Sequence, residues 1–125
     1  MESAAVESRE KAAIVDVVLD YFEGWFTGDE ERMRRALHPR LAKRRLADDE
    51  AGLVESTTAG MIEATAAGAG VQPLESTAIE VEVVDVYDPI ATVVVRSTVY
   101  REYVQLVRTS EGWKIVNTLY VRTAA

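Results

Sequence analysis

The sequence predicts an α+β fold in which three N-terminal helices pack on a strongly curved, mainly antiparallel sheet. Two observations predict this fold. The first half of the chain has apolar residues at helical spacing, whereas the segment from Ala91 to Arg122 is rich in Val, Tyr, Thr and Ile. Within that segment, Thr109–Gly112 carries the polar, Gly-containing signal of a hairpin turn. A sheet that curls over helices leaves a cavity on its concave face, and such cavities are common ligand sites.

Length and composition set limits on the function. A chain of 125 residues is long enough for one domain with its own core, and we expect residues 1–125 to form one domain with a flexible N-terminus at 1–5. The chain has no Cys and one His, so we expect neither thiol chemistry nor a multi-His metal site, although carboxylates could hold a hard cation. No metal residue and no cofactor are predicted. A net charge of −7 argues against nucleic-acid binding. The polar, acidic N-terminus and the absence of an apolar span indicate a cytoplasmic protein that does not enter membranes.

The basic residues are unevenly distributed. Seven of the 14 Lys and Arg residues lie between Arg32 and Arg45, with no acidic residue among them. This segment is either a solvated helix face and loop, which is the commoner case, or a docking patch for an anionic ligand or partner.

The first helix is expected at about Val6–Phe26, because apolar residues including Tyr21 and Trp25 recur at helical spacing opposite a polar side. Gly24 permits close backbone packing near its end. Gly28 is expected to end this helix and Asp29 to cap a second, at about Glu30–Leu37.

The middle of the chain gives weaker signals. His38-Pro39 closes the second helix, and Arg40–Leu46 reads either as a short strand or as a loop. The acidic run that ends at Glu50 favours the start of a helix, so a third helix is expected at about Ala51–Ala67, with Leu53 and Val54 buried.

About four long antiparallel strands are expected after Thr77. Ile79, Val81 and Val83 alternate with glutamates, which indicates a strand with one wet face. The apolar phase then breaks, so a bulge is expected at Val83–Asp85. Tyr87–Pro89 reads as a turn.

Strand alternation also predicts which side chains face the helices. In the last strand the inward set is Trp113, Ile115, Asn117, Leu119 and Val121. Asn117 would then be a buried amide that needs a partner, either a ligand or a neighbouring side chain. Ser97 is expected to point inward, where it either joins Asn117 or allows tight packing. Glu102 lies either at the inner rim or in solvent.

The opposite face of the sheet is expected to be partly apolar. Its members would be Val94, Thr98, Tyr100, Val116, Thr118 and Tyr120. Because a monomer rarely exposes such a patch, we expect a homodimer that forms through this face.

Three stretches resemble the nuclear transport factor 2-like superfamily, also called the SnoaL-like or ketosteroid-isomerase-like superfamily. They are Tyr21–Asp29, Met33–Pro39, and Tyr103–Arg108 together with Gly112–Val116. The Gly-x-Trp-Lys-Ile-Val strand and the His-Pro exit are most similar to the group labelled putative lumazine-binding. The resemblance implies a cystatin-like cone, an apolar pocket and a dimer, but it does not specify an activity.

Ketosteroid isomerases of this superfamily use a tyrosine of the first helix to stabilise an oxyanion. Tyr21 lies at the matching distance, seven residues before Gly28. Their general-base aspartate and second carboxylic acid would fall near Arg45 and Val104, neither of which can take that role.

The leading hypothesis is a protein that binds a small apolar or aromatic molecule in the pocket. The candidate ligand-binding residues are Tyr21, Trp25, His38, Ser97 and Asn117. A SnoaL-like cyclase, isomerase or dehydratase is the alternative, with Tyr21, His38 and Glu102 as candidate catalytic residues. A non-catalytic dimerisation or interaction module with a filled cavity is the third possibility.

Overall fold

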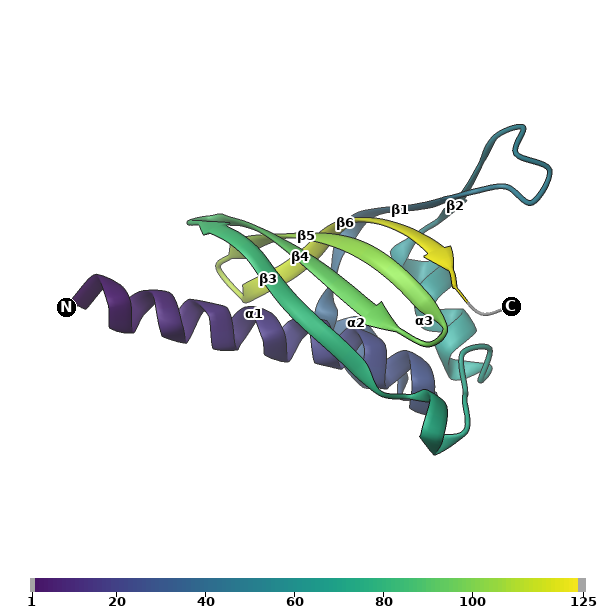
Figure 1. The fold of residues 1–125 in the computed structure, drawn as a ribbon, viewed down its shortest axis with the longest axis horizontal. Helices are drawn as coiled ribbons and strands as arrows, with labels where there is room; N and C mark the ends of the chain where they lie inside the picture. The colour runs from purple at the N-terminus through teal and green to yellow at the C-terminus, as the bar shows by residue number, and fades with distance from the viewer. Residues whose placement is uncertain (1, 124–125) are drawn as a thin grey trace.

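The computed structural model describes the backbone of residues 2–123 and the side chains of residues 6–123 (Figure 1). The side chains of residues 1–5 lie outside the described residues, so the flexible N-terminus expected there stays a prediction. The assignment of residues 1–125 to one domain also stays a prediction. The elements in chain order are α1 (Glu2–Thr27), α2 (Glu30–Ala36), β1 (Leu37–Leu46), β2 (Leu53–Ser56), α3 (Thr58–Ala66), the 3-10 turn η1 (Leu74–Ser76), β3 (Ile79–Tyr87), β4 (Ile90–Ser97), β5 (Tyr100–Thr109) and β6 (Gly112–Arg122).

The six strands form one curved sheet in the order β2-β1-β6-β5-β4-β3. Every neighbouring pair is antiparallel except β1 and β6, which run parallel. Figure 1 shows α1 lying along the concave face of the sheet, with α2 and α3 near the β1 side. The predicted α+β architecture with a curved, mainly antiparallel sheet is therefore confirmed.

Irregularities in the strand register add to the curvature. The register between β3 and β4 shifts between Val83 and Asp85, where the broken phase predicted a bulge. A second shift, which was not predicted, lies between Gln105 and Leu106 of β5, opposite Asn117 and Ile115 of β6. A bulge increases local twist and reverses which side chains face inward beyond it.

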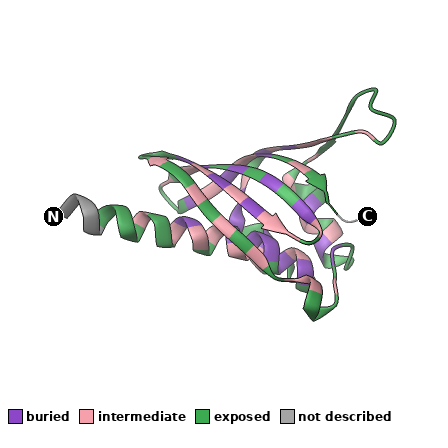
Figure 2. Cartoon of the chain, in the orientation of Figure 1, coloured by how far each residue is buried: buried purple, intermediate pink, exposed green. Residues whose placement is uncertain are grey.

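The core lies between the concave face and the helices (Figure 2). Each fully buried aliphatic or aromatic side chain contributes roughly 1.5–3 kcal/mol to folding. The core members at 2% exposure or less include Ile14, Val18, Phe22 and Phe26 of α1, Met33 of α2, and Val93, Val95, Val104, Leu106 and Ile115 of the sheet.

The junction between α1 and α2 follows its sequence signals. Gly28 has a φ of 74°, which an L side chain rarely adopts, and it ends α1. The Asp29 side chain caps α2 by accepting a hydrogen bond from the Arg32 amide at 3.2 Å. A Cβ on Gly24 would lie 3.1 Å from both the Asp29 oxygen and the Met33 nitrogen, so the glycine lets the two helices approach closely, as expected.

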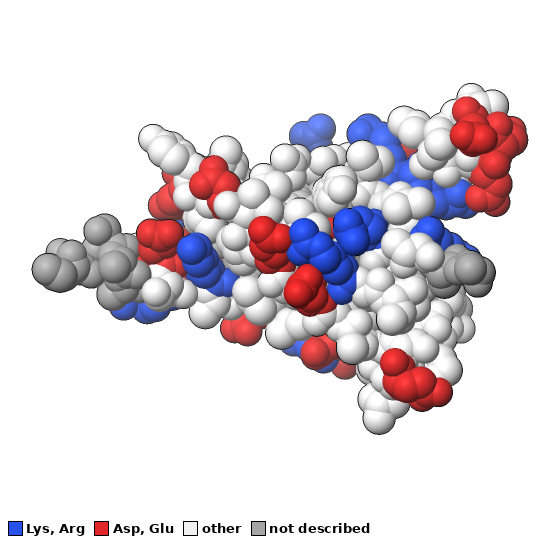
Figure 3. Space-filling model, viewed as in Figure 1, with Lys and Arg blue, Asp and Glu red and all other residues white. Residues whose placement is uncertain are grey.

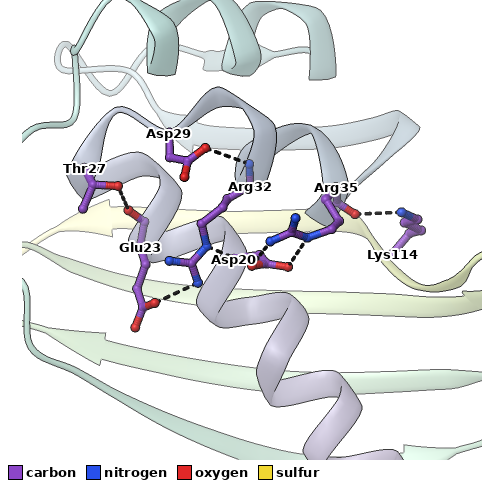
Figure 4. Close-up of polar contacts among 7 residues, drawn as sticks. All are labelled: Asp20, Glu23, Thr27, Asp29, Arg32, Arg35 and Lys114. Carbon is purple, nitrogen blue, oxygen red and sulfur yellow. Dashed lines mark hydrogen bonds and ion pairs between the residues drawn. The ribbon is translucent and has the colours of Figure 1, made fainter.

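An ion cluster centred on Asp20 holds α1, α2 and β6 together (Figure 4). The Asp20 carboxylate accepts from Arg32 Nε at 2.9 Å and from Arg35 at 2.9 and 3.0 Å. Arg32 also pairs with Glu23 at 2.8 Å, and Lys114 Nζ donates to the Arg35 carbonyl at 2.7 Å. The hydrogen bond from Arg35 is the largest cause that lowers the pKa of Asp20, and burial opposes it.

The basic segment Arg32–Arg45 is thus largely neutralised within the molecule. Six of its seven basic residues pair with carboxylates, namely Arg32, Arg34, Arg35, Lys43, Arg44 and Arg45. This pairing favours the structural interpretation of the segment over a continuous docking patch.

The predicted third helix at Ala51–Ala67 was wrong in its first half. Leu53–Ser56 instead forms β2, which pairs with β1 as a hairpin that protrudes from the sheet (Figure 1). Leu53 and Val54 are 59% and 36% exposed rather than buried. The acidic run forms the hairpin tip, where Glu50 has a φ of 59°, and α3 begins only after its cap, Thr57. Arg40–Leu46 belongs to a long strand, which settles its ambiguity.

Replacement of Asp20 by Asn is expected to lower the free energy of unfolding by about 1–2 kcal/mol at pH 7, because charged hydrogen bonds to two arginines are lost. A lowered folded-state pKa means that this stabilisation is present above the unfolded-state pKa and is lost as the pH falls through the folded-state value. The loss from Asp20→Asn should therefore shrink below about pH 4. Urea unfolding from pH 7 to pH 2 measures it. Asp16→Asn, at an exposed position of the same helix, should change little; an equal loss there would contradict the assignment.

Candidate functional site

A cavity of about 470 Å³ opens between α1, α3 and the strands β1, β5 and β6. Five aromatic side chains line it, those of Tyr21, Phe22, Trp25, Tyr100 and Tyr120. The remaining lining residues are Lys43, Arg45, Val54, Glu55, Ser56, Thr57, Gly60, Met61, Ala64, Ala69, Glu102 and Arg122. Its volume lies in the range of sites that bind small organic molecules.

The cavity contains a buried polar cluster, which we name the Tyr21–Lys43–Glu102 cluster. The Tyr21 hydroxyl donates to Glu102 Oε2 at 2.6 Å. Lys43 Nζ donates to the same carboxylate oxygen at 2.9 Å and also to the Tyr21 hydroxyl. The three residues are only 3%, 5% and 2% exposed, respectively. The three groups therefore hydrogen-bond to one another in a place largely closed to water.

Strand register brings the cluster together from distant parts of the sequence. Lys43 of β1 lies beside Thr118 of β6, and Glu102 of β5 lies opposite Tyr120 of β6. The α1 helix supplies Tyr21 from the other side. Lys43 Nζ also lies 4.0 Å from the centre of the Tyr120 ring, a distance at which a cation–π attraction stabilises the ammonium group.

Each charge in the cluster depends on its neighbours. A carboxylate or ammonium group buried alone would cost several kcal/mol, so Glu102 and Lys43 compensate one another. Burial raises the pKa of Tyr21 well above its usual value, and the negative charge of Glu102 raises it further. Tyr21 therefore remains a neutral phenol that donates its proton to Glu102 in a hydrogen bond.

Two polar atoms near the cluster have unused hydrogen-bonding capacity. Thr118 is 1% exposed, and its Oγ1 has no hydrogen-bond partner within residues 6–123. Over the same residues, both hydrogen bonds that Glu102 accepts within the cluster go to its Oε2, and none goes to Oε1. Oε1 is thus available as an acceptor for a ligand in the cavity.

Trp25 forms a fixed part of the wall. Its Nε1 donates to the Tyr100 hydroxyl at 3.1 Å, and Phe26 stacks on Tyr100 with ring centres 6.2 Å apart. A Cβ on Gly70 would lie 2.2 Å from the Trp25 indole, so the chain after α3 passes directly against this ring. These contacts present a flat aromatic face to the cavity in one orientation.

The structure brings three of the six candidate residues to the cavity: Tyr21, Trp25 and Glu102. His38 does not line it; its Nδ1 accepts from the Arg40 amide at 3.0 Å, and its carbonyl accepts from Thr58 Oγ1 at 2.6 Å. His38 lies two residues after the end of α2 and is already part of β1, because the strand follows the helix directly.

Ser97 also lies away from the lining residues. Its Oγ accepts from the amides of Val99 and Tyr100 at 3.1 and 2.8 Å, so it shapes the turn between β4 and β5. The inward and outward alternation of β4 does not continue through this turn, because β5 starts a new strand at Tyr100. Tyr100 therefore faces the cavity and is 8% exposed, although an outward position was predicted.

The predicted inward position of Asn117 was wrong. Its amide donates to Gln105 Oε1 at 3.1 Å on the outer face, and Leu119 and Val121 are 51% and 57% exposed. The bulge at Val116 is the physical reason, since one extra residue turns every later side chain to the opposite face. Thr118 and Tyr120 consequently face inward, and the predicted outer set was wrong for both.

Lys43 was missed as a site residue because it lies in the basic segment. One signal could have identified it. Leu41 and Lys43 share a face if this segment is a strand, and Leu41 is apolar. Both are buried in the structure, at 8% and 5% exposure.

The described residues contain no group of three His, Cys, Asp or Glu side chains arranged to hold a metal ion. Within the same part of the chain, no helix is both long enough and apolar enough to cross a bilayer.

We expect strong energetic coupling between Lys43 and Glu102. Lys43→Met or Glu102→Gln alone leaves a buried charge unpaired and should cost about 3–5 kcal/mol, whereas the double variant should cost less than the sum by about 2 kcal/mol or more. Urea unfolding of the four proteins measures the coupling.

The matched control is Arg44→Met with Glu55→Gln, since this ion pair on β1 and β2 is 43% and 66% exposed. Its coupling should stay below about 1 kcal/mol. Additive effects of Lys43→Met and Glu102→Gln would contradict the compensated pair.

Comparison with known proteins assigns the sequence to a family. The family model described as "Putative lumazine-binding" matches residues 9–121. No curated protein matches the sequence.

Several solved structures share the fold. An NTF-2 like protein of unknown function from Silicibacter pomeroyi DSS-3 superimposes with a TM-score of 0.75 at 16% identity, over 93% of this chain and 98% of that one. An NTF2-like protein of unknown function from Shewanella baltica OS155 gives 0.71 at 17% identity, over 94% and 97%. A ketosteroid isomerase-like protein from Erwinia carotovora atroseptica SCRI1043 gives 0.62 at 13% identity, over 91% and 96%. The chain has the nuclear transport factor 2-like fold and belongs to the family described as "Putative lumazine-binding".

Proposed function

We propose that the protein binds a small, flat, largely aromatic organic molecule in the cavity. The observation that carries this proposal is an open space of about 470 Å³ with aromatic walls and a buried hydrogen-bonding cluster. The description of the family also supports it. The third possibility, an interaction module, predicted a cavity filled by side chains, and the open cavity favours a ligand-binding role instead.

The polar cluster indicates which ligand edge would fit. Glu102 Oε1 can accept a hydrogen bond, and the ammonium of Lys43, which donates two of its three N–H groups within the cluster, favours an electron-rich oxygen beside it. A ring that carries an N–H next to a carbonyl, as in a cyclic amide, satisfies both requirements. Heterocycles of the lumazine or flavin type have this edge, and Trp25 offers a flat surface for their rings.

An acid–base enzyme of the SnoaL-like type is the second candidate. It is favoured by one observation, namely that a carboxylate lies 2.6 Å from the hydroxyl of Tyr21 inside the cavity. In such an enzyme Glu102 would accept a proton from the substrate at Oε1. Lys43 would stabilise the developing negative oxygen, and the hydroxyl of Tyr21 would join it by turning away from Glu102 as that carboxylate becomes protonated.

A homodimer through the outer face of the sheet remains part of the proposal, with a revised set of residues. Tyr103 of β5 lies next to Val94 of β4 and Leu119 of β6, so the three form a continuous apolar strip. Tyr103 and Leu119 are each 51% exposed in the single chain, and a second copy would cover them.

Ligand binding is tested by thermal unfolding with pterin-, lumazine- and flavin-type heterocycles, steroids and polyketide-like aromatics. A ligand at 100 times its Kd stabilises the folded state by about 2.7 kcal/mol, which should raise Tm by about 5 °C or more. Native mass spectrometry of the same samples should show two chains with bound ligand.

A matched pair of variants locates the site. Ala64 lines the cavity on α3, whereas Ala66 of the same helix is exposed outside it. Ala64→Leu should abolish the shift in Tm by filling the cavity, and Ala66→Leu should retain it. If no compound shifts Tm, or if Ala64→Leu leaves the shift unchanged, the proposed pocket function is wrong.

A further inference from the structure

The cavity carries a charge opposite to that of the whole protein. The chain has 21 acidic and 14 basic residues, yet the lining includes three cations, Lys43, Arg45 and Arg122, against the carboxylates of Glu55 and Glu102. Lys43 neutralises Glu102 within the cluster. Glu55 pairs with Arg44, which does not line the cavity. Arg45 pairs only with Asp48, whose side chain is 99% exposed, and Arg122 has no ion pair within residues 6–123, so the positive charge of the lining resides on these two arginines.

These two arginines lie on the inner face of the sheet next to the cluster. Arg45 follows Lys43 by two residues on β1, and Arg122 follows Tyr120 by two residues on β6, so each pair shares a face by strand alternation. Arg122 lies opposite Tyr100 in the register of β5 and β6. The arginines thus extend the lining from the cluster toward the strand ends at which β1 and β6 finish.

Arg45 is held by weak partners that a ligand could replace. Its guanidinium reaches Asp48 at 3.3 Å, and the Asp48 side chain is 99% exposed. Such surface ion pairs contribute about 0–1 kcal/mol. The charge of Arg45 also acts inside the cavity, because it opposes the rise in the pKa of Tyr120 that burial causes.

The surface shows the same division of charge along the β1–β2 hairpin. In Figure 3, basic side chains gather at the base of this hairpin and acidic ones at its tip. The acidic tip comprises Asp48, Asp49 and Glu50. Basic residues therefore lie toward the cavity and acidic residues lie away from it.

We infer that the ligand of this cavity is an aromatic carboxylate. Its rings would lie against Trp25 and the other aromatic wall residues, and its carboxylate would pair with Arg45 and Arg122, whose planar guanidinium groups match a carboxylate in two parallel hydrogen bonds. A neutral ligand would leave this positive region without a partner, and a cationic ligand would be repelled. The inference rests on the proposed pocket function and specifies its substrate class.

The test compares 2-naphthoate with 2-naphthamide, two probes of nearly the same shape that differ in charge. Binding is followed by fluorescence of Trp25 in a Trp113→Phe background, since Trp113 bonds to Glu10 and does not line the cavity. We expect the carboxylate to bind at least about tenfold more tightly, the amount that one charged hydrogen bond supplies. Higher salt should reduce this preference.

Arg45→Gln and Arg122→Gln should each weaken naphthoate binding by about five- to tenfold, and the double variant should remove the preference for the carboxylate. Naphthamide binding should change by less than about twofold in all three, which shows that the pocket remains folded. Arg101→Gln is the matched control, because Arg101 is exposed on β5 and lies outside the cavity lining. It should alter neither affinity.

Two results would overturn the inference. Equal affinity for both probes in the wild-type protein would show that binding does not depend on the negative charge of the ligand. The proposed pocket function would then still stand. Absence of binding by both probes would also overturn the inference. In that case the heterocycle screen decides the proposed function separately, since a shift in Tm that Ala64→Leu abolishes would still support a pocket for neutral ligands.

Discussion

The buried ion pair between Lys43 and Glu102 is the constraint on which the candidate site depends. Neither charge is stable alone beneath the helices, and each is compensated by the other and by the hydroxyl of Tyr21. The three residues come from α1, β1 and β5, so the pair also fixes how these elements approach one another. A polar cluster beside the aromatic wall of the cavity gives a ligand one preferred orientation.

The parts of the fold that arise from local signals could be predicted from the sequence. Gly28 and Asp29 end one helix and start the next, and the broken phase after Val83 marks the bulge in β3. The parallel pairing of β1 with β6 leaves no local signal, because the two strands lie far apart in the sequence. The acidic residues before Gly52 suit a helix start as well as a hairpin tip, so the sequence favoured the wrong element there.

The site could be predicted only in part, because some of its residues are brought together by contacts between segments far apart in the sequence. Trp25 was identified from helix periodicity and Tyr21 from its distance to Gly28, as the resemblance implies, while strand alternation left Glu102 either at the inner rim or in solvent; all three line the cavity. No glycine or proline marks the position of the bulge at Val116 in the sequence. Because of this bulge, Thr118 and Tyr120 face inward and Asn117 faces outward. Lys43 could not be distinguished from the neighbouring arginines in the sequence. Its burial depends on pairing with Glu102, which lies far away in the sequence and comes close only in the folded chain.

A pH titration of the tyrosine side chains by NMR tests the cluster most directly, with the Tyr21 signal assigned by its loss in Tyr21→Phe. Burial and the charge of Glu102 raise the pKa of Tyr21, so its phenol should keep its proton above pH 10, where free tyrosine ionises. In Glu102→Gln the Tyr21 signal should titrate at a lower pH than in the wild-type protein. If Tyr21 titrates at the free value in the wild-type protein, the closed, charge-compensated cluster does not exist.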